Sequence, residues 1–541
     1  MPVRLHAASR MLWLLAVALC GTGGRHGSEG VFSVKDFGAK GDGITLDTRP
    51  IQRAIDECAT GGGVVLLPPG TYLSGSLELR SNVEFHIQTG ATLLGSKNLG
   101  DYAEHVPALK SYNDLFLRQS LLYAEGQTNI AITGGGTIDG QGAGFKVVTN
   151  KKPDKYRDRP YVIRFVECRN VNVEEVRMQN SASWMQQYLA CEDLRIHGIS
   201  VFNHANKNND MMDIDGCRNV VITDCLGDTD DDGITLKSTS ERITENVTIS
   251  NCVISSHCNA IKTGTESTGG FRNVLVSNII VKPSRVTANM SGRPWGISGI
   301  ALTLVDGGIL EAVSLSNIIL DGPDVPIFIR LGNRARKHWE GAPEPGVGSV
   351  RHVSFSHISA FHAKSTGCSI TGVPDHPVTD ITLEDVHLQF AGASKESASA
   401  RLPELEDQYP EATMWKDLPS YGFFVRHVRD LRMTDVELSL DSADSRPAMV
   451  LSDVTDARLV NVRMGVFPEA GSAFTLERVS RFLLTQSAFQ GSASAVIQLV
   501  GRENQDISVI ENDLRAFEGL CMPARAAEMI ITGSGNVMRS R

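Results

Sequence analysis

The sequence predicts an all-β protein, a right-handed parallel β-helix with a short N-terminal capping helix. A unit of alternating apolar residues, opened by Asn or Asp and closed by a polar turn, recurs at intervals of commonly about 25 to 28 residues, as in stacked solenoids. Gly is plentiful, at 51 residues, and aromatic residues make up only 6%, which suits short strands joined by tight turns. A chain of 541 residues ordinarily suggests several domains, but a solenoid grows by adding coils instead.

The recurring units share strand alternation, with apolar side chains expected inside and polar ones outside. They begin at residues 82, 129, 170, 193, 219, 246, 273, 352, 380, 430, 456 and 506. Leucine-rich repeats are the main competing architecture, but their fixed leucine and asparagine pattern is absent from the sequence.

One amphipathic helix is expected, over residues 48–59. Ile51, Ala54, Ile55 and Cys58 recur at helical spacing and would share one face. Such a helix would cover the open end of the solenoid, where unpaired strand edges invite aggregation.

Residues 1–30 resemble a secretory signal peptide with its leader. Two arginines precede the apolar stretch 11–20, which is too short to span a membrane. We therefore expect a secreted or periplasmic protein; a lipoprotein signal with Cys20 as the lipid-bearing residue stays open. Residues 31–541 would form a single β-helix domain, with further coils and loops over 341–541.

The charge distribution and the absence of further apolar stretches limit the possible binding partners. The net charge of −10 and the scattered basic residues do not provide the basic face that a nucleic-acid partner needs, and no further apolar stretch predicts membrane binding beyond that lipid anchor. We expect a monomer.

Cysteines at 217, 225, 252 and 258 fall in strand-like segments about one coil apart and are expected to be buried, with a disulfide among them left open.

Asp210, Asp231 and Asp232 stand out because the segments 208–217 and 227–238 lie about one coil apart. Adjacent coils stack at about 4.8 Å, so these carboxylates should form one exposed cluster. Like charges repel, and such a cluster usually binds a cation or handles protons. The alternative is Asp in solvated turns, but strand-like runs flank both groups.

At these motifs the chain resembles glycoside hydrolase family 28, the polygalacturonase family of β-helix enzymes. The resemblance covers most of residues 31–340, including GGGTIDGQG at 134–142 and RPYVIRF at 159–165. It maps the family's Asn-x-Asp motif onto Asn208, Asn209 and Asp210, and its paired aspartates onto Asp231 and Asp232. The resemblance implies hydrolysis with inversion: Asp231 as the general acid, and Asp210 with Asp232 activating water.

The chemistry is consistent with these residue types. An inverting glycosidase needs one protonated carboxyl and one carboxylate separated by room for water, and crowding by other carboxylates raises one pKa. Adjacent residues of an ideal strand face opposite ways, so Asp231 and Asp232 share a site only where the strand bends, and we expect Gly233 to permit that bend.

Two motifs of the family are missing. Its Gly-His-Gly motif aligns with Cys258, Asn259 and Ala260, so the histidine is absent there. His257 and Asn259 lie on one strand face and are expected in the cleft, where His257 could substitute; a packed or solvated histidine is the competing interpretation.

The family's Arg-x-Lys motif, which grips the substrate carboxylate, should fall near residues 296–303, where the sequence has no cation. The candidate replacements are Lys262, Arg272, Arg293, Arg330 and Arg334, each of which could instead be an ordinary surface charge.

Aromatic residues offer sugar-stacking surfaces. Trp295 is undecided between stacking and packing, and for Trp184 packing is favoured. The polar loop 392–420, with Tyr409 and Trp415, either overhangs a cleft or is a passive excursion.

We therefore expect an inverting glycoside hydrolase of an acidic, pectic polysaccharide such as polygalacturonan or rhamnogalacturonan, with no cofactor and no metal. Two alternatives stay open: a Ca²⁺-dependent polysaccharide lyase, in which the aspartates bind calcium, and a non-catalytic carbohydrate-binding β-helix.

Overall fold

The computed structural model describes residues 30–149, 151, 154–287, 292, 294–392, 402–523 and 531–538. The expected leader, apart from Gly30, lies outside the described residues, and so does Arg293. Among the described residues, no helix is long and apolar enough to cross a membrane.

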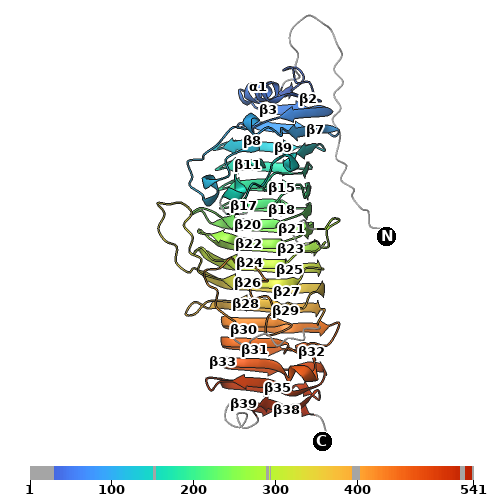
Figure 1. The fold of residues 1–541 in the computed structure, drawn as a ribbon, viewed down its shortest axis with the longest axis vertical. Coiled ribbons are helices and arrows are strands. Elements are labelled where there is room, and N and C mark those ends of the chain that lie inside the picture. The colour runs from blue at the N-terminus through green and yellow to red at the C-terminus, as the bar shows by residue number, and fades with distance from the viewer. Residues whose placement is uncertain are drawn as a thin grey trace, which may run out of the picture.

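The chain winds as a column of coils, with α1 (Thr48–Ala59) at its N-terminal end (Figure 1). Parallel strands pair from coil to coil in three stacks, so the predicted parallel β-helix is confirmed.

The first stack is β1 (Val31–Ser33), β3 (Gly63–Leu67), β6 (Val83–Ile87), β9 (Thr128–Thr133), β12 (Arg169–Glu174), β15 (Glu192–His197), β18 (Arg218–Thr223), β21 (Thr244–Ser256), β23 (Phe271–Val281), β25 (Ile309–Asp321), β27 (Ser349–Ala363), β29 (Val378–Phe390), β30 (Phe423–Leu440), β31 (Met449–Val460), β33 (Ser472–Thr485), β36 (Gln505–Ile510) and β39 (Ile531–Ser534).

The second stack is β2 (Asp42–Leu46), β4 (Gly70–Ser74), β7 (Ala91–Gly95), β10 (Thr137–Asp139), β13 (Arg177–Gln179), β16 (Ser200–Asn203) and β19 (Leu226–Thr229), then the far ends of the long strands β21 to β30, then β32 (Arg463–Val466), β34 (Ala488–Gly491), β37 (Asp513–Leu514) and β40 (Val537–Met538).

The third stack is β5 (Leu77–Glu78), β8 (Ser120–Glu125), β11 (Tyr161–Val166), β14 (Gln186–Leu189), β17 (Met212–Asp215), β20 (Ile234–Ser238), β22 (Asn259–Ser267), β24 (Ser298–Leu304), β26 (Val325–Leu331), β28 (Cys368–Thr371), the first residues of β30, β31 and β33, then β35 (Ala493–Val500) and β38 (Phe517–Met522).

The asparagines that open the repeated units turn the chain into the first stack. Asn219, Asn246 and Asn273 adopt φ between 54° and 58°, a left-handed conformation that Asn tolerates better than most residues. Their side chains also bond from coil to coil, with Asn246 donating to Asn219 at 3.1 Å and Asn273 donating to Asn246 at 3.0 Å. The same residue type therefore sets the turn and ties neighbouring coils together.

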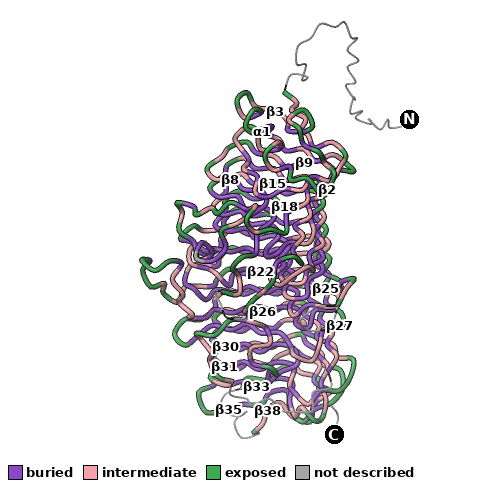
Figure 2. The backbone as a smooth tube through the Cα atoms, turned by 45° about the horizontal axis from the view of Figure 1, so that its top comes forward, coloured by how far each residue is buried: buried purple, intermediate pink, exposed green. Residues whose placement is uncertain are grey.

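One hydrophobic core extends through the column from Val34 to Cys521. Figure 2 shows the buried backbone running inside the column and the exposed residues gathered on its outer turns. Helix α1 has the bounds expected from the sequence, and Ile51, Ala54, Ile55 and Cys58 are its buried residues. The prediction of this helix is confirmed.

The cysteines at 217, 225 and 252 are buried, as expected, whereas Cys258 is only partly buried. No disulfide joins the cysteines that the structure describes.

Candidate active site

The aspartate groups lie in the turns that lead from the second stack into the third. Asp210 comes shortly before β17, and Asp231 and Asp232 come shortly before β20. Because these strands pair in parallel register, the two turns lie on adjacent coils, and the backbone N–H of Met211 donates to the carbonyl of Asp232 at 2.9 Å. The structure thus brings the three aspartates together; their catalytic roles remain a prediction.

The expected exposure of this cluster was wrong. Asp210 is 2% exposed and Asp232 is 3% exposed, and only Asp231 is half-buried. Loop residues approach the turns: Arg159 donates to Asn208 at 3.1 Å, and the Tyr409 hydroxyl lies 3.4 Å from Lys262 Nζ. The sequence spacing sets which coils meet, but not what packs over them.

Asp232 is held by two groups of the next coil. Lys262 Nζ lies 2.7 Å from its Oδ2, and Asn259 Nδ2 donates to its Oδ1 at 2.7 Å. Burial opposes ionisation, but Lys262, Lys237 and the hydrogen bond from Asn259 outweigh it and hold the pKa of Asp232 below its usual value. Asp232 is therefore the ionised member of the pair.

Asp231 and Asp210 are shifted the other way. Burial, reinforced by the neighbouring charge of Asp232, raises the pKa of Asp231. Burial, with the carboxylates of Asp213 and Asp231, raises the pKa of Asp210 well above its usual value. The side-chain amide of Asn208 lies 3.3 Å from Asp231 Oδ2. Crowded carboxylates hold protons between them, and the cluster therefore contains both an acid and a base.

Gly233 lies in the bend that brings Asp231 and Asp232 into one site, as expected. Its φ is not in the left-handed range, and Asp231 and Asp232 reach the same site because they belong to the turn before β20. A Cβ at position 233 would lie 2.4 Å from the carbonyl oxygen of Ala260 and 2.8 Å from a methyl of Ile254. Glycine is needed here because the next coil approaches closely.

The side chains of His257 and Asn259 have different partners. Asn259 faces Asp232, whereas the Nδ1 of His257 lies 2.9 Å from Asp230 Oδ1, and its Nε2 lies 3.0 Å from the carbonyl oxygen of Val286. Neither contact of His257 involves the three aspartates. The expectation that His257 replaces the family's histidine beside the acid is therefore not supported by its contacts.

Several candidate cations have other partners. Arg330 is buried and donates to the carbonyls of Gly372 and Glu404, at 3.1 and 2.6 Å. Arg272 donates to Glu245 at 2.5 Å on the outside of the first stack. Arg334 is bonded to Asp306, at 2.9 Å from its Nε. Of the five sequence candidates, only Lys262 contacts the aspartates in the part of the chain that the structure describes.

Two other charged residues near the aspartates were not identified as site residues by the sequence analysis. Lys237 lies 3.6 Å from Asp213 and 3.3 Å from Glu266, and the charges of Asp231 and Asp210 act on the half-buried Lys155. Burial lowers the pKa of Lys155 despite those carboxylates. Lys237 lies on β20, five residues after Asp232, and the pairing of β20 with β17 could have identified it. Lys155 lies in the 3-10 helix Asp154–Tyr156, outside the repeated strands, and has no such signal.

The tryptophans are differently placed. Trp184 is 8% exposed and packs with Phe116 and Tyr161, as expected, with Lys237 Nζ 4.4 Å from its ring centroid. Trp295 is half-buried, and Lys364 Nζ lies 4.2 Å from its ring centroid. One face of each indole is thus covered by an ammonium group.

The described part of the loop, 402–420, reaches the site. Tyr409 is 42% exposed and its hydroxyl lies near Lys262, while Trp415 is buried and donates to the carbonyl of Pro403 at 2.9 Å. Glu411 is half-buried on the same loop, and burial raises its pKa to about 7. The loop therefore overhangs the site and adds an unexpected carboxyl to it.

Comparisons with known proteins agree with this architecture. The model of glycosyl hydrolases family 28 matches residues 63–404. A probable polygalacturonase of Vitis vinifera is 26% identical over 390 residues, covering 67% of this chain and 75% of the relative. An exopolygalacturonase of Zea mays is 25% identical over 383 residues, covering 69% and 86%.

Two solved structures share the fold. The family 28 exopolygalacturonase of Yersinia enterocolitica has a TM-score of 0.60 at 20% identity, covering 80% of this chain and 78% of that one. The exopolygalacturonase of Thermotoga maritima has a TM-score of 0.59 at 21% identity, covering 76% and 92%. Because the family match spans more than half of the chain, this protein belongs to glycosyl hydrolases family 28. It is a polygalacturonase-like glycoside hydrolase.

Proposed function

We propose that the protein hydrolyses glycosidic bonds of a pectic polysaccharide, polygalacturonan or rhamnogalacturonan, with inversion at the anomeric carbon. One observation carries the mechanism: adjacent carboxyls have opposite pKa shifts, because Lys262 and Asn259 hold Asp232 ionised while burial raises the pKa of Asp231. One group can then supply a proton while the other accepts one.

In this mechanism Asp231 protonates the leaving oxygen, Asp232 deprotonates the attacking water, and Asp210 helps to hold that water. Asn208 contacts Asp231 and keeps its carboxyl oriented. The relatives whose names specify a substrate act on galacturonan, which supports a pectic substrate.

Recognition of the uronate carboxylate is assigned to cations near the three aspartates. Lys262 already neutralises Asp232 at 2.7 Å, whereas Lys155 is half-buried near Asp231 and Asp210. We assign Lys155 to the substrate carboxylate, together with Arg293, which the sequence places on the coil after Lys262. The Tyr409 ring, 42% exposed above Lys262, offers a stacking surface for a sugar.

The position of Lys262 also weighs against the calcium-lyase alternative. An ammonium 2.7 Å from Asp232 occupies the place beside that carboxylate that a bound Ca²⁺ would need. We further propose export of the protein, on the pattern of residues 1–30; N-terminal sequencing of the exported product would test it.

Product analysis tests the reaction. Purified protein is assayed for reducing ends on polygalacturonan, rhamnogalacturonan and neutral algal glycans, and NMR follows the anomer released first. Hydrolysis predicts a product without the unsaturated absorbance of lyase products, with the anomeric configuration opposite to that of the cleaved linkage. Retention, an unsaturated product, or binding without release of reducing ends would each contradict the proposal.

A further inference from the structure

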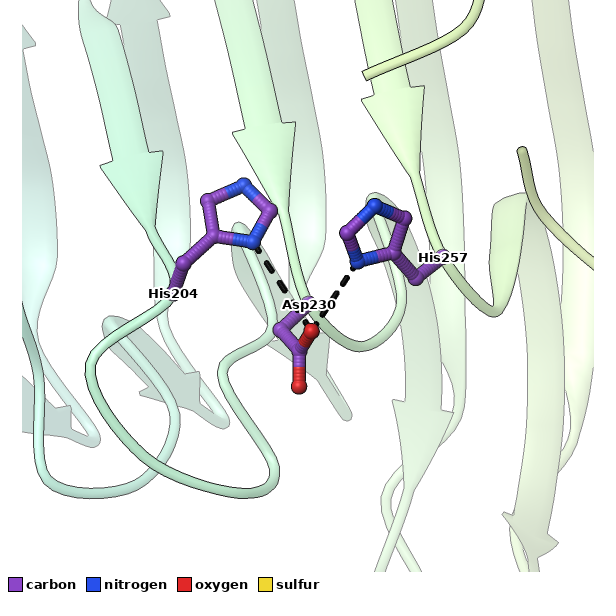
Figure 3. A group of neighbouring side chains, drawn as sticks. All are labelled: His204, Asp230 and His257. Carbon is purple, nitrogen blue, oxygen red and sulfur yellow. Dashed lines mark hydrogen bonds and ion pairs between the residues drawn. The ribbon is translucent and has the colours of Figure 1, made fainter. Parts of the chain in front are cut away.

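His204, Asp230 and His257 are stacked on three consecutive coils. Each is the first residue after a strand of the second stack, following Asn203 of β16, Thr229 of β19 and Ser256 of β21. Those three strand ends are register partners, so the three side chains repeat at the spacing between coils. Figure 3 shows the carboxylate of Asp230 between the two imidazole rings.

Both imidazoles present the same ring nitrogen to Asp230. His257 Nδ1 lies 2.9 Å from Asp230 Oδ1, and His204 Nδ1 lies 3.8 Å from the same oxygen (Figure 3). The ring centroids are 5.0 Å apart. Two nitrogens and one oxygen thus converge on a single small volume.

The opposite ring nitrogens are held by acceptors. His257 Nε2 lies 3.0 Å from the carbonyl oxygen of Val286, and His204 Nε2 lies 2.9 Å from Asp228 Oδ1. A carbonyl oxygen only accepts, and Asp228 also accepts from the Ser284 hydroxyl at 2.6 Å and from the Arg285 backbone at 3.2 Å. Each Nε2 therefore donates its hydrogen, and in a neutral ring each Nδ1 turns a lone pair toward Asp230.

We propose that His204, Asp230 and His257 bind one divalent transition-metal ion, with Zn²⁺ as the best-fitting ion. Three electron-pair donors facing one another are stabilised by a cation between them. Metal-binding histidines characteristically donate their other N–H to a carboxylate or backbone carbonyl, which is the arrangement of Asp228 and Val286 here.

The dimensions suit zinc. Bonds of about 2.0 to 2.2 Å to nitrogen and oxygen in a tetrahedron place neighbouring ligand atoms roughly 3.3 Å apart. In the structure the Nδ1 atoms of His257 and His204 lie 2.9 and 3.8 Å from Asp230 Oδ1, one distance below that value and one above it. Two imidazoles favour zinc over calcium or magnesium, which prefer oxygen. The three side chains are only 9%, 4% and 1% exposed, so the ion would be largely enclosed.

The site would stabilise the coils that carry the catalytic residues. Asp230 directly precedes Asp231, and His257 is two residues before Asn259, so the ion would connect three successive turns next to the aspartate cluster. It would leave Asp231 and Asp232 outside its ligand set, and hydrolysis would not pass through it. Binding to the folded chain alone adds stability.

Calorimetric titration of chelator-treated, dialysed protein with ZnCl₂ tests this. We expect one Zn²⁺ per chain, with a Kd at or below about 1 µM, and an increase in melting temperature. His204→Ala and Asp230→Asn should each weaken binding at least about 100-fold. His352→Ala is the matched control, because His352 forms an exposed pair with Asp380 at 2.6 Å elsewhere on the solenoid.

Cobalt distinguishes this site from the second group of potential ligands, Asp231, Asp232 and Cys258. Co²⁺ bound by His204, Asp230 and His257 should give visible absorption bands typical of four-coordinate cobalt, without a charge-transfer band from a thiolate ligand. Cys258→Ser should leave Co²⁺ binding intact. Absence of binding, equal binding by His204→Ala and the control, or loss of binding in Cys258→Ser would each overturn the proposal. None of these readouts depends on the substrate or on activity.

Discussion

The ammonium nitrogen of Lys262 lies 2.7 Å from Oδ2 of Asp232, on the preceding coil. This ion pair is almost completely buried, with side-chain exposures of 3% and 4%. Removing one partner of such a pair leaves an uncompensated buried charge, so the two residues titrate as a unit. Because Lys262 stabilises the ionised form of Asp232, Asp232 loses its proton at a lower pH than Asp231.

Replacing Lys262 with Met should shift the acidic limb of the pH profile. Lys262 lowers the pKa of Asp232, so its loss raises that pKa, and Asp232 becomes protonated at a higher pH. The acidic limb of kcat/KM should therefore move to higher pH. Lys282→Met is the control, because Lys282 is exposed and contacts Ser255 at 3.2 Å. An unmoved acidic limb would remove Asp232 from the role of base.

Asp231→Asn should abolish proton donation while preserving the fold. The amide is isosteric with the carboxyl but is not an acid, and loss of a positioned proton donor typically costs a factor on the order of 10² to 10⁴ in rate. Steady-state kcat on polygalacturonan and the melting temperature measure the two effects. Asp224→Asn, at an exposed position with φ of 60° that Asn also adopts, should retain full activity. A rate loss below tenfold for Asp231→Asn would assign the acid elsewhere.

Glu411 should make substrate binding sensitive to pH near neutrality. Its pKa is raised to about 7, so it is mostly neutral below that pH and becomes an anion above it, facing a polyanionic substrate. The KM of the wild type should rise between pH 6 and 8, and Glu411→Gln should flatten that rise. Asp407→Asn, exposed on the same loop, should behave like the wild type. Parallel pH dependences in all three proteins would exclude Glu411.

Lys155→Ala and Arg293→Ala should raise KM more than they lower kcat, because both residues are assigned to the substrate carboxylate. The effect should shrink on methyl-esterified pectin, whose carboxylates are neutralised. Lys151→Ala changes an exposed lysine of the same segment and should be silent. An equal rise in KM on esterified and free substrate would mean that these residues do not bind the substrate carboxylate.

Gly233→Ala should destabilise the protein by about 1 to 3 kcal/mol, as overpacking typically does. Its Cβ would lie 2.4 Å from the Ala260 carbonyl, and the turn carrying Asp232 must shift to relieve that contact. Chemical denaturation and kcat should both report the change. Gly61→Ala adds its Cβ where no atom lies within 4 Å and serves as the control; equal stability of the two variants would contradict the close approach.

The sequence by itself determined the coils, the capping helix and the two adjacent turns that carry Asp210 and Asp232. These follow from local periodicity: strand alternation and Asn turns recur along the chain, and register between neighbouring coils converts spacing in sequence into proximity in space. The residues of the helix 48–59 were likewise readable from its own apolar face.

Only the tertiary structure decided what surrounds those aspartates. Tyr409 reaches Lys262 across 147 residues, His257 faces Asp230 instead of Asp231 and Asp232, and Gly233 is required by a neighbouring coil. The burial of the cluster depends on loops of irregular length. Loops carry no periodicity, so where they pack, and the pKa values that their packing sets, could not be derived from the repeat.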